Sequence, residues 1–290
     1  MIEAINALFN FQFMQYAFCA CLLASIGCGI IGTYVVVRRI GFLAGGIAHT
    51  VLAGMGIAYF LGGSLMLGAV IVAIISAILI GLIKLKWHQD EDILIAAFWS
   101  VGMAVGILFI SRTPGYNIDL MSYLFGNILL VTKQDLLFML LLDGAIIVTV
   151  SAFYKQFLAT AFDEEFAGLR GVRVEWLYIL MLCMIALTVV LLINIVGLIL
   201  VIALLIMPAA SAAQFAGSIT RMMVIAIILS MIVTVSGLLL SYSPDLPSGS
   251  TIIVLSGLVY VLSILMRRVL NWKNKRQVAG HAAGPRSGIN

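Results

Sequence analysis

The amino-acid sequence predicts an all-α polytopic membrane protein, because its composition and its charge distribution both suit a lipid environment. Hydrophobic residues make up 63% of the 290 residues, compared with about 45–50% in globular proteins. The chain has only 16 Lys and Arg and 12 Asp and Glu residues, too few to cover a surface that faces water. The basic residues separate long apolar stretches and do not cluster on a soluble face, so a secreted enzyme and a nucleic-acid-binding module are excluded.

About eight to nine helices are expected to cross the bilayer. A hydrocarbon core about 30 Å thick requires roughly 20 apolar residues in a helix. Two stretches without formal charge, Ile40–Ile83 and Trp176–Thr220, are each about twice this length and are expected to fold back once, the first at Gly62–Ser64 and the second near Asn194. Single crossings are expected at Tyr16–Val37, Ile93–Ser111, Asp135–Phe153, Met222–Tyr242 and Thr251–Met266.

The basic residues orient the helices, because Lys and Arg are retained in cytoplasmic loops. With nine crossings and an extracytoplasmic N-terminus, all Lys and Arg residues except Arg112 and Lys133 lie on the cytoplasmic side. Residues 1–272 are interpreted as one transmembrane domain. Residues 273–290 form a basic tail, which is expected to be disordered in the cytoplasm.

Two ionisable side chains fall within the expected spans, where such groups are costly and usually functional. His49 lies in a stretch rich in Gly and Ala, and imidazole is a common ligand for divalent transition metals, although a hydrogen-bonded structural histidine fits the same position. Asp143 lies near the middle of its helix and either faces a cavity or pairs across an interface. Pro208 is expected to kink its helix, because proline removes a backbone hydrogen bond, and a conformational change could use such a kink.

The connection between Lys155 and Glu175 is polar and too long for a simple turn. It contains a run of three acidic residues at 163–165 and is competent to form a helix, so it suits the docking of a partner protein. An ordinary solvated loop is the alternative. The sequence has no G-x-x-x-x-G-K-[ST] motif, so this chain does not hold a nucleotide phosphate in a Walker loop.

Five segments follow one another along the chain. They are RRIGFLAGGIAHTVLAGMGIAYFLGG (Arg38–Gly63), DLMSYLFGNIL (Asp119–Leu129), FDEEFAGLRGV (Phe162–Val172), VGLILVIALLIMPAASA (Val196–Ala212) and DLPSGSTIIVLSG (Asp245–Gly257). In this order they resemble the permease subunits of bacterial ATP-binding-cassette (ABC) importers for zinc and manganese, the ZnuB-type family. The resemblance extends over nearly the whole chain.

This resemblance implies a homodimeric permease in the bacterial plasma (inner) membrane, with its C-terminus in the cytoplasm. It also implies an ATPase subunit that docks from inside, an extracytoplasmic metal-binding protein that delivers the ion, and no tightly bound cofactor. Within a coupling segment at about 160–173, the residues expected to contact the ATPase are Asp163, Glu164, Glu165, Phe166, Ala167 and Gly171. Asp245, Pro247 and Gly249 are expected in an outer loop.

One position departs from the family pattern. Members of the family usually carry an acidic residue four positions before the histidine, and this chain has Gly45 there. The metal ligand is therefore expected to be His49 of both copies, or His49 with Asp143 as a substitute carboxylate, unless the cargo differs. Zinc is favoured over manganese and iron as the transported ion, because loss of a hard oxygen ligand weakens manganese binding more.

Three other functions suit a polytopic chain. A permease for chelated iron, haem or cobalamin would share the coupling to an ATPase, but His49 would not line its wider pathway. A stand-alone secondary metal transporter would need an array of carboxylates, for which Asp143 is one candidate. An intramembrane enzyme would need a nucleophile and a base in register, and no serine pairs convincingly with the intramembrane histidine.

Overall fold

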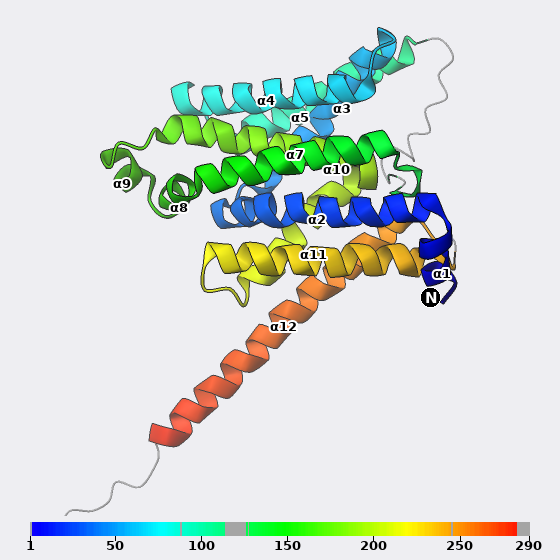
Figure 1. Cartoon of the computed structure of the whole chain (residues 1–290). Coiled ribbons are helices and arrows are strands. Elements are labelled where there is room, and N and C mark those ends of the chain that lie inside the picture. The colour runs from blue at the N-terminus through cyan, green and yellow to red at the C-terminus, as the bar shows by residue number, and fades with distance from the viewer. Residues whose placement is uncertain (1, 88, 114–125, 127, 245, 283–290) are drawn as a thin grey trace, which may run out of the picture.

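The computed structural model describes residues 2–87, 89–113, 126, 128–244 and 246–282, and it contains helices and no strands within these ranges (Figure 1). The elements are α1 (Ile2–Asn10), α2 (Gln12–Arg38), α3 (Gly41–Phe60), α4 (Leu65–Trp87), α5 (Glu91–Ser111), the 3-10 turn η1 (Ile128–Leu130), α7 (Lys133–Ala152), α8 (Tyr154–Phe162), α9 (Glu164–Leu169), α10 (Val174–Ala213), α11 (Ile219–Tyr242) and α12 (Ser248–Ala282). Most of the long helices run side by side, with α8 and α9 at one end of the bundle and α1 at the other.

Eight helices in the described part of the chain are long and apolar enough to cross a membrane, which confirms the predicted fold class. They are α2, α3, α4, α5, α7, the first part of α10 (Val174–Ile193), α11 and the first part of α12 (Ser248–Trp272). The turn expected at Gly62–Ser64 separates α3 from α4, and Gly62 has the positive φ of 69° that such a turn requires.

Helix α10 contains the second expected reversal and explains why the expected nine crossings become eight long helices and one short one. Its helical geometry breaks at Gly197, where φ is 76° and ψ is 168°, a region of backbone space that is essentially restricted to glycine. The break lies three residues beyond the predicted position at Asn194. The second limb, Leu200–Ala213, is shorter than a full membrane span and contains Pro208 in helical backbone.

The second limb of α10 returns toward the end of the bundle that carries α8 and α9. A Cβ atom added to Gly45 of α3 would lie 3.0 Å from Ile202, and one added to Gly41 would lie 2.8 Å from Ile206. Residue numbers therefore rise along one helix as they fall along the other, so the second limb is antiparallel to α3.

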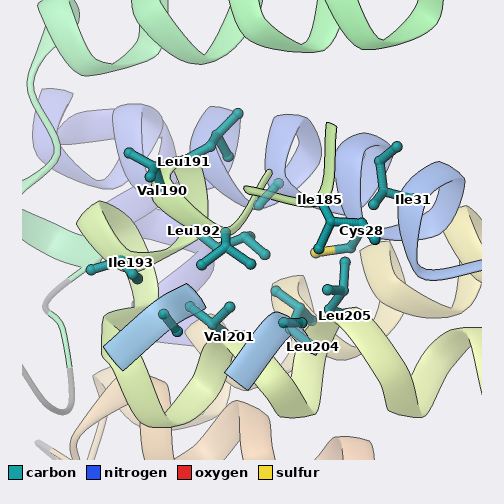
Figure 2. Packing of buried hydrophobic residues seen from close by; sticks show 14 of the residues in the cluster. Cys28, Ile31, Ile185, Val190, Leu191, Leu192, Ile193, Val201, Leu204 and Leu205 are labelled. Carbon is teal, nitrogen blue, oxygen red and sulfur yellow. The ribbon is translucent and has the colours of Figure 1, made fainter. Parts of the chain in front are cut away.

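The two limbs of α10 pack against α2 in the centre of the bundle. Figure 2 shows Cys28 and Ile31 of α2 beside Ile185 of the first limb and Leu204 and Leu205 of the second limb. All five side chains are at most 1% exposed. The contact between α2 and the folded-back α10 is therefore one central part of the hydrophobic core.

Small residues allow this close packing, as expected in a membrane, where lipid provides little hydrophobic drive for helix association. A Cβ atom on Gly29 would lie 2.6 Å from the backbone nitrogen of Ile227 in α11, and one on Gly32 would collide with the carbonyl oxygen of Leu205. Gly27, Gly29 and Gly32 form a G-x-G-x-x-G pattern. The glycines of this pattern allow α2 to pack closely against neighbouring helices.

Helix α12 diverges from the bundle in Figure 1 and continues to Ala282, beyond the expected domain end at residue 272. The expected disordered tail therefore begins as helix. The physical reason is that residues 273–282 contain no proline and are mostly helix-forming types such as Lys, Arg, Gln and Ala.

Candidate functional site

His49 lies on α3 and is half-buried, with its imidazole stacked on the indole of Trp99 from α5. The ring centroids are 4.0 Å apart and the planes differ by 10°. The Nδ1 atom is buried and has no hydrogen-bond partner among the described residues. Within the described part of the chain, no hydrogen bond thus holds this nitrogen of the imidazole.

Gly45 lies one helical turn before His49 and faces two apolar side chains. A Cβ atom at this position would be 3.0 Å from Ile202 and 3.8 Å from the ring of Trp99. A larger side chain at 45 would thus compete with Ile202 and Trp99 for space. The surroundings of the imidazole in this chain are aromatic and aliphatic.

Helices α3 and α5 approach each other closely beside this stack. A Cβ atom on Gly102 of α5 would lie 2.7 Å from the Cα atom of Thr50, and one on Gly106 would lie 2.6 Å from the carbonyl oxygen of Leu52. The two glycines form one face of α5, since residues four apart are neighbours on a helix. Their lack of side chains brings Trp99 within reach of His49.

Asp143 lies elsewhere in the bundle, on α7, and is 2% exposed. One of its carboxylate oxygens would be 2.8 Å from a Cβ atom on Gly27 of α2, a position that is also close to Thr188 of α10. Neither oxygen has a hydrogen-bond partner in the part of the chain that the structure describes. The carboxylate thus contacts α2, whereas His49 contacts α5.

Over the residues described above, no group of three or more His, Cys, Asp or Glu side chains is arranged to share a metal ion. Within these residues, the imidazole of His49 therefore lies beside Trp99 without a cluster of further metal-ligating side chains.

Helices α8 and α9 form the segment predicted to meet a partner. Asp163 begins α9 by accepting a hydrogen bond of 2.9 Å from the backbone N–H of Phe166. Ala167 is buried, whereas Phe166 is 52% exposed, and Glu165 is exposed beside it. Gly171, with φ of 81°, ends the segment. The segment therefore rests on the bundle through Ala167 and presents Phe166 outward.

Arg38, the last residue of α2, attaches this segment to the bundle. Its guanidinium forms an ion pair with Glu164 and donates a hydrogen bond of 3.0 Å to the carbonyl oxygen of Thr160. The next residue, Arg39, has a positive φ of 60° and turns the chain into α3. The segment is thus connected through one turn to the helix that carries His49.

A second ionic cluster joins three helices at the same end of the bundle. Lys84 of α4 pairs with Glu91 of α5, and the hydroxyl of Tyr178 in α10 donates a hydrogen bond of 2.8 Å to Glu91. The ammonium group of Lys84 also lies 4.6 Å from the centre of the Tyr178 ring. These three residues hold α4, α5 and α10 together.

Sequence reasoning missed Trp99, Arg38 and Glu91 as site residues. The charges of Arg38 and Glu91 at helix ends are a visible signal, but Glu164, the partner of Arg38, and Tyr178, which donates to Glu91, are distant in sequence. Among the predicted outer-loop residues, Asp245 lies outside the described residues. Pro247 and Gly249 lie at the start of α12, where the carbonyl oxygen of Pro247 accepts from the backbone N–H of Thr251 at 3.1 Å.

Known proteins resemble the chain over most of its length. It is 42% identical to a probable metal transport system membrane protein of Chlamydia trachomatis over 254 residues, which cover 86% of this chain and 87% of that protein. It is 31% identical to the manganese transport system membrane protein MntC of Halalkalibacterium halodurans over 276 residues, covering 93% and 94% of the two chains.

A solved structure shares the fold. The structure of PsaBC from Streptococcus pneumoniae in complex with Fab matches with a TM-score of 0.84 and 31% identity, over 94% of this chain and 100% of that chain. The sequence also matches the model of the ABC 3 transport family over residues 10–267. The match includes α2 to α11 and most of the apolar part of α12, and the chain therefore belongs to the ABC 3 transport family.

Proposed function

We propose that this chain is the membrane-spanning permease subunit of an ATP-driven importer for divalent transition metal ions. The observation that carries the proposal is an imidazole on a transmembrane helix, with an unpartnered buried nitrogen, in a chain related to proteins named as metal and manganese transporters. An intramembrane ionisable residue of this kind is a candidate for the path of the ion.

Zinc is the favoured cargo, with manganese and iron as the alternatives. His49 is a borderline nitrogen donor, and Gly45 supplies no oxygen ligand beside it. Asp143 is the one buried carboxylate among the described residues; it contacts α2, and no described contact directs it toward His49. A nitrogen-only donor set suits zinc better than manganese, which prefers oxygen ligands.

The pathway is expected to form between two copies of the chain. His49 and Trp99 are only half-buried in a single chain, so their face is open to a second copy. One nitrogen from each copy would hold the ion weakly, which allows its release. Pro208, in the short second limb of α10 beside α3, is the proposed site of helix movement.

Energy is supplied by a separate ATPase subunit in the cytoplasm. The chain has no Walker motif, and the segment with Asp163, Glu165, Phe166 and Gly171 offers an exposed surface anchored on α2. On the opposite side, an extracytoplasmic metal-binding protein would deliver the ion. The distribution of basic residues supports an orientation in the bacterial plasma membrane with α8, α9 and the C-terminus on the cytoplasmic side.

Metal accumulation by cells that lack their own zinc and manganese importers tests this proposal. The cells express the permease with its ATPase and metal-binding protein. His49→Ala is expected to reduce zinc accumulation strongly, whereas His281→Ala, a matched change in the basic tail, leaves it unchanged. Zinc uptake at the wild-type level by His49→Ala would remove His49 from the pathway, and uptake without the ATPase would indicate a secondary transporter.

A further inference from the structure

We propose that Trp99 is the positioning residue of the metal pathway and that it replaces the hydrogen bond by which proteins usually orient a metal-binding histidine. This inference rests on the proposed role of His49. It adds to that role a second residue, a physical means of orientation, and a consequence for the choice of metal.

The argument begins with the imidazole nitrogens. A histidine that binds metal through one ring nitrogen almost always donates a hydrogen bond from the other to a carboxylate, a carbonyl or water, which fixes the plane of the ring. The Nδ1 atom of His49 is enclosed by protein and has no such acceptor among the residues that the structure describes. Nε2 is then the nitrogen left for an ion.

Another contact must therefore hold the ring. The indole of Trp99 covers one face of the imidazole at 4.0 Å, with the planes 10° from parallel. A parallel stack restricts tilting of the imidazole out of its plane and directs both nitrogens along the surface of the indole. It leaves the opposite face of the imidazole uncovered by this contact.

Trp99 is itself held in place, as a positioning residue must be. Its Nε1–H donates to the sulfur of Met103 at 3.2 Å, one turn along α5. The ring of Phe42, at the start of α3, lies 5.9 Å from the indole. The absence of side chains at Gly102 and Gly106 sets the short distance between α3 and α5. The stack is therefore determined by helix packing.

This arrangement bears on the class of cargo. An indole offers no lone pair to a metal, and Gly45 beside it offers none either. Each chain thus supplies one oriented nitrogen in apolar surroundings. Such a site is expected to discriminate in favour of ions that accept imidazole, zinc before manganese. Trp99 contributes to this selectivity because its apolar indole fills the space beside the imidazole, where an oxygen ligand would otherwise fit.

Transport kinetics of the complete importer test the positioning role. Trp99→Phe keeps an aromatic face, whereas Trp99→Leu removes it; Trp87→Leu, an exposed tryptophan at the end of α4, is the matched control. We expect Trp99→Leu to raise the KM for zinc about tenfold or more, as loss of an orienting partner does at metal sites. Trp99→Phe and Trp87→Leu should stay within about twofold of wild type.

A binding measurement separates this role from simple loss of folding. In a purified permease whose other tryptophans, Trp87, Trp176 and Trp272, are replaced by Phe, paramagnetic Co²⁺ alone is added and the fluorescence of Trp99 is recorded. Co²⁺ held by the stacked imidazole is expected to quench the indole, and His49→Ala is expected to abolish the quenching.

Two outcomes would overturn the inference, and they differ from failure of the proposed function. If His49→Ala stops zinc uptake but Trp99→Leu transports with the wild-type KM, then the role of His49 in the pathway is supported and the positioning role of Trp99 is wrong. If Co²⁺ quenches Trp99 equally in His49→Ala, the ion does not bind at the stack. If His49→Ala itself transports normally, the proposed function of the site fails as well.

Discussion

Replacing Gly102 by alanine perturbs the contact that brings α5 to α3. A Cβ atom at this position would lie 2.7 Å from Thr50 Cα, and an ordinary contact begins at 3.4 Å, so the helices must separate by about 0.7 Å. The neighbour is backbone and cannot rotate away. Overpacking of this kind costs about 1–3 kcal/mol, while alanine regains about 1 kcal/mol of helix propensity. We expect a net destabilisation of up to about 2 kcal/mol.

The matched control is Gly144→Ala on α7, where a Cβ atom would have no neighbour within 4 Å. This change should leave the free energy of unfolding at the wild-type value or raise it by up to about 1 kcal/mol, because alanine has the higher helix propensity. The free energy of unfolding is measured by titrating the purified permease in detergent micelles with sodium dodecyl sulfate and following circular dichroism. Equal effects of the two substitutions would refute the close approach of α3 and α5.

Gly102→Ala also tests the connection between helix packing and the site. Separation of α5 from α3 should loosen the stack of Trp99 on His49, one turn away. Zinc uptake per folded molecule is therefore expected to fall in this variant and to stay at the wild-type level in Gly144→Ala. Unchanged uptake in a destabilised Gly102→Ala protein would show that the stack does not depend on this contact.

Further predictions concern the reversal of α10 and the segment formed by α8 and α9. Gly197→Ala should destabilise the permease by about 1–3 kcal/mol, because φ of 76° with ψ of 168° is costly for alanine; a wild-type unfolding curve would contradict this backbone geometry. Glu164→Gln removes the ion pair with Arg38 and should lower zinc transported per ATP hydrolysed, and an unchanged ratio would count against that attachment. Phe166→Ala, at an exposed side chain, should weaken copurification of the ATPase without changing the unfolding midpoint; full recovery of the ATPase would exclude Phe166 from the interface.

The order of the membrane-spanning helices, and their number to within one, could be predicted from the sequence, because a bilayer imposes one length on each apolar stretch. The reversal within Trp176–Thr220 was predicted for the same reason. The break lies within three residues of the expected position, but the shortness of the second limb was not predicted, since it depends on the backbone conformation at Gly197. A glycine in an apolar helix either allows close contact with another helix or breaks the helix. Composition alone does not distinguish these two roles.

The site was only partly predictable. His49 stands out because it is an ionisable group in an apolar stretch. Its stack with Trp99 depends on how α5 is rotated and spaced against α3, which follows from Gly102 and Gly106 fitting against Thr50 and Leu52. Likewise, the partner of Glu164 is 126 positions away in sequence, so spacing within the acidic segment could not reveal Arg38.

Zinc uptake into proteoliposomes tests the central claim most directly. Vesicles contain the purified permease alone or together with its ATPase, the metal-binding protein is supplied outside with zinc, and ATP is supplied on the side of α8 and α9. We predict accumulation only when the ATPase and ATP are both present, and strongly reduced accumulation with His49→Ala. Equal accumulation by the permease alone, or by the His49→Ala complex, would contradict the account.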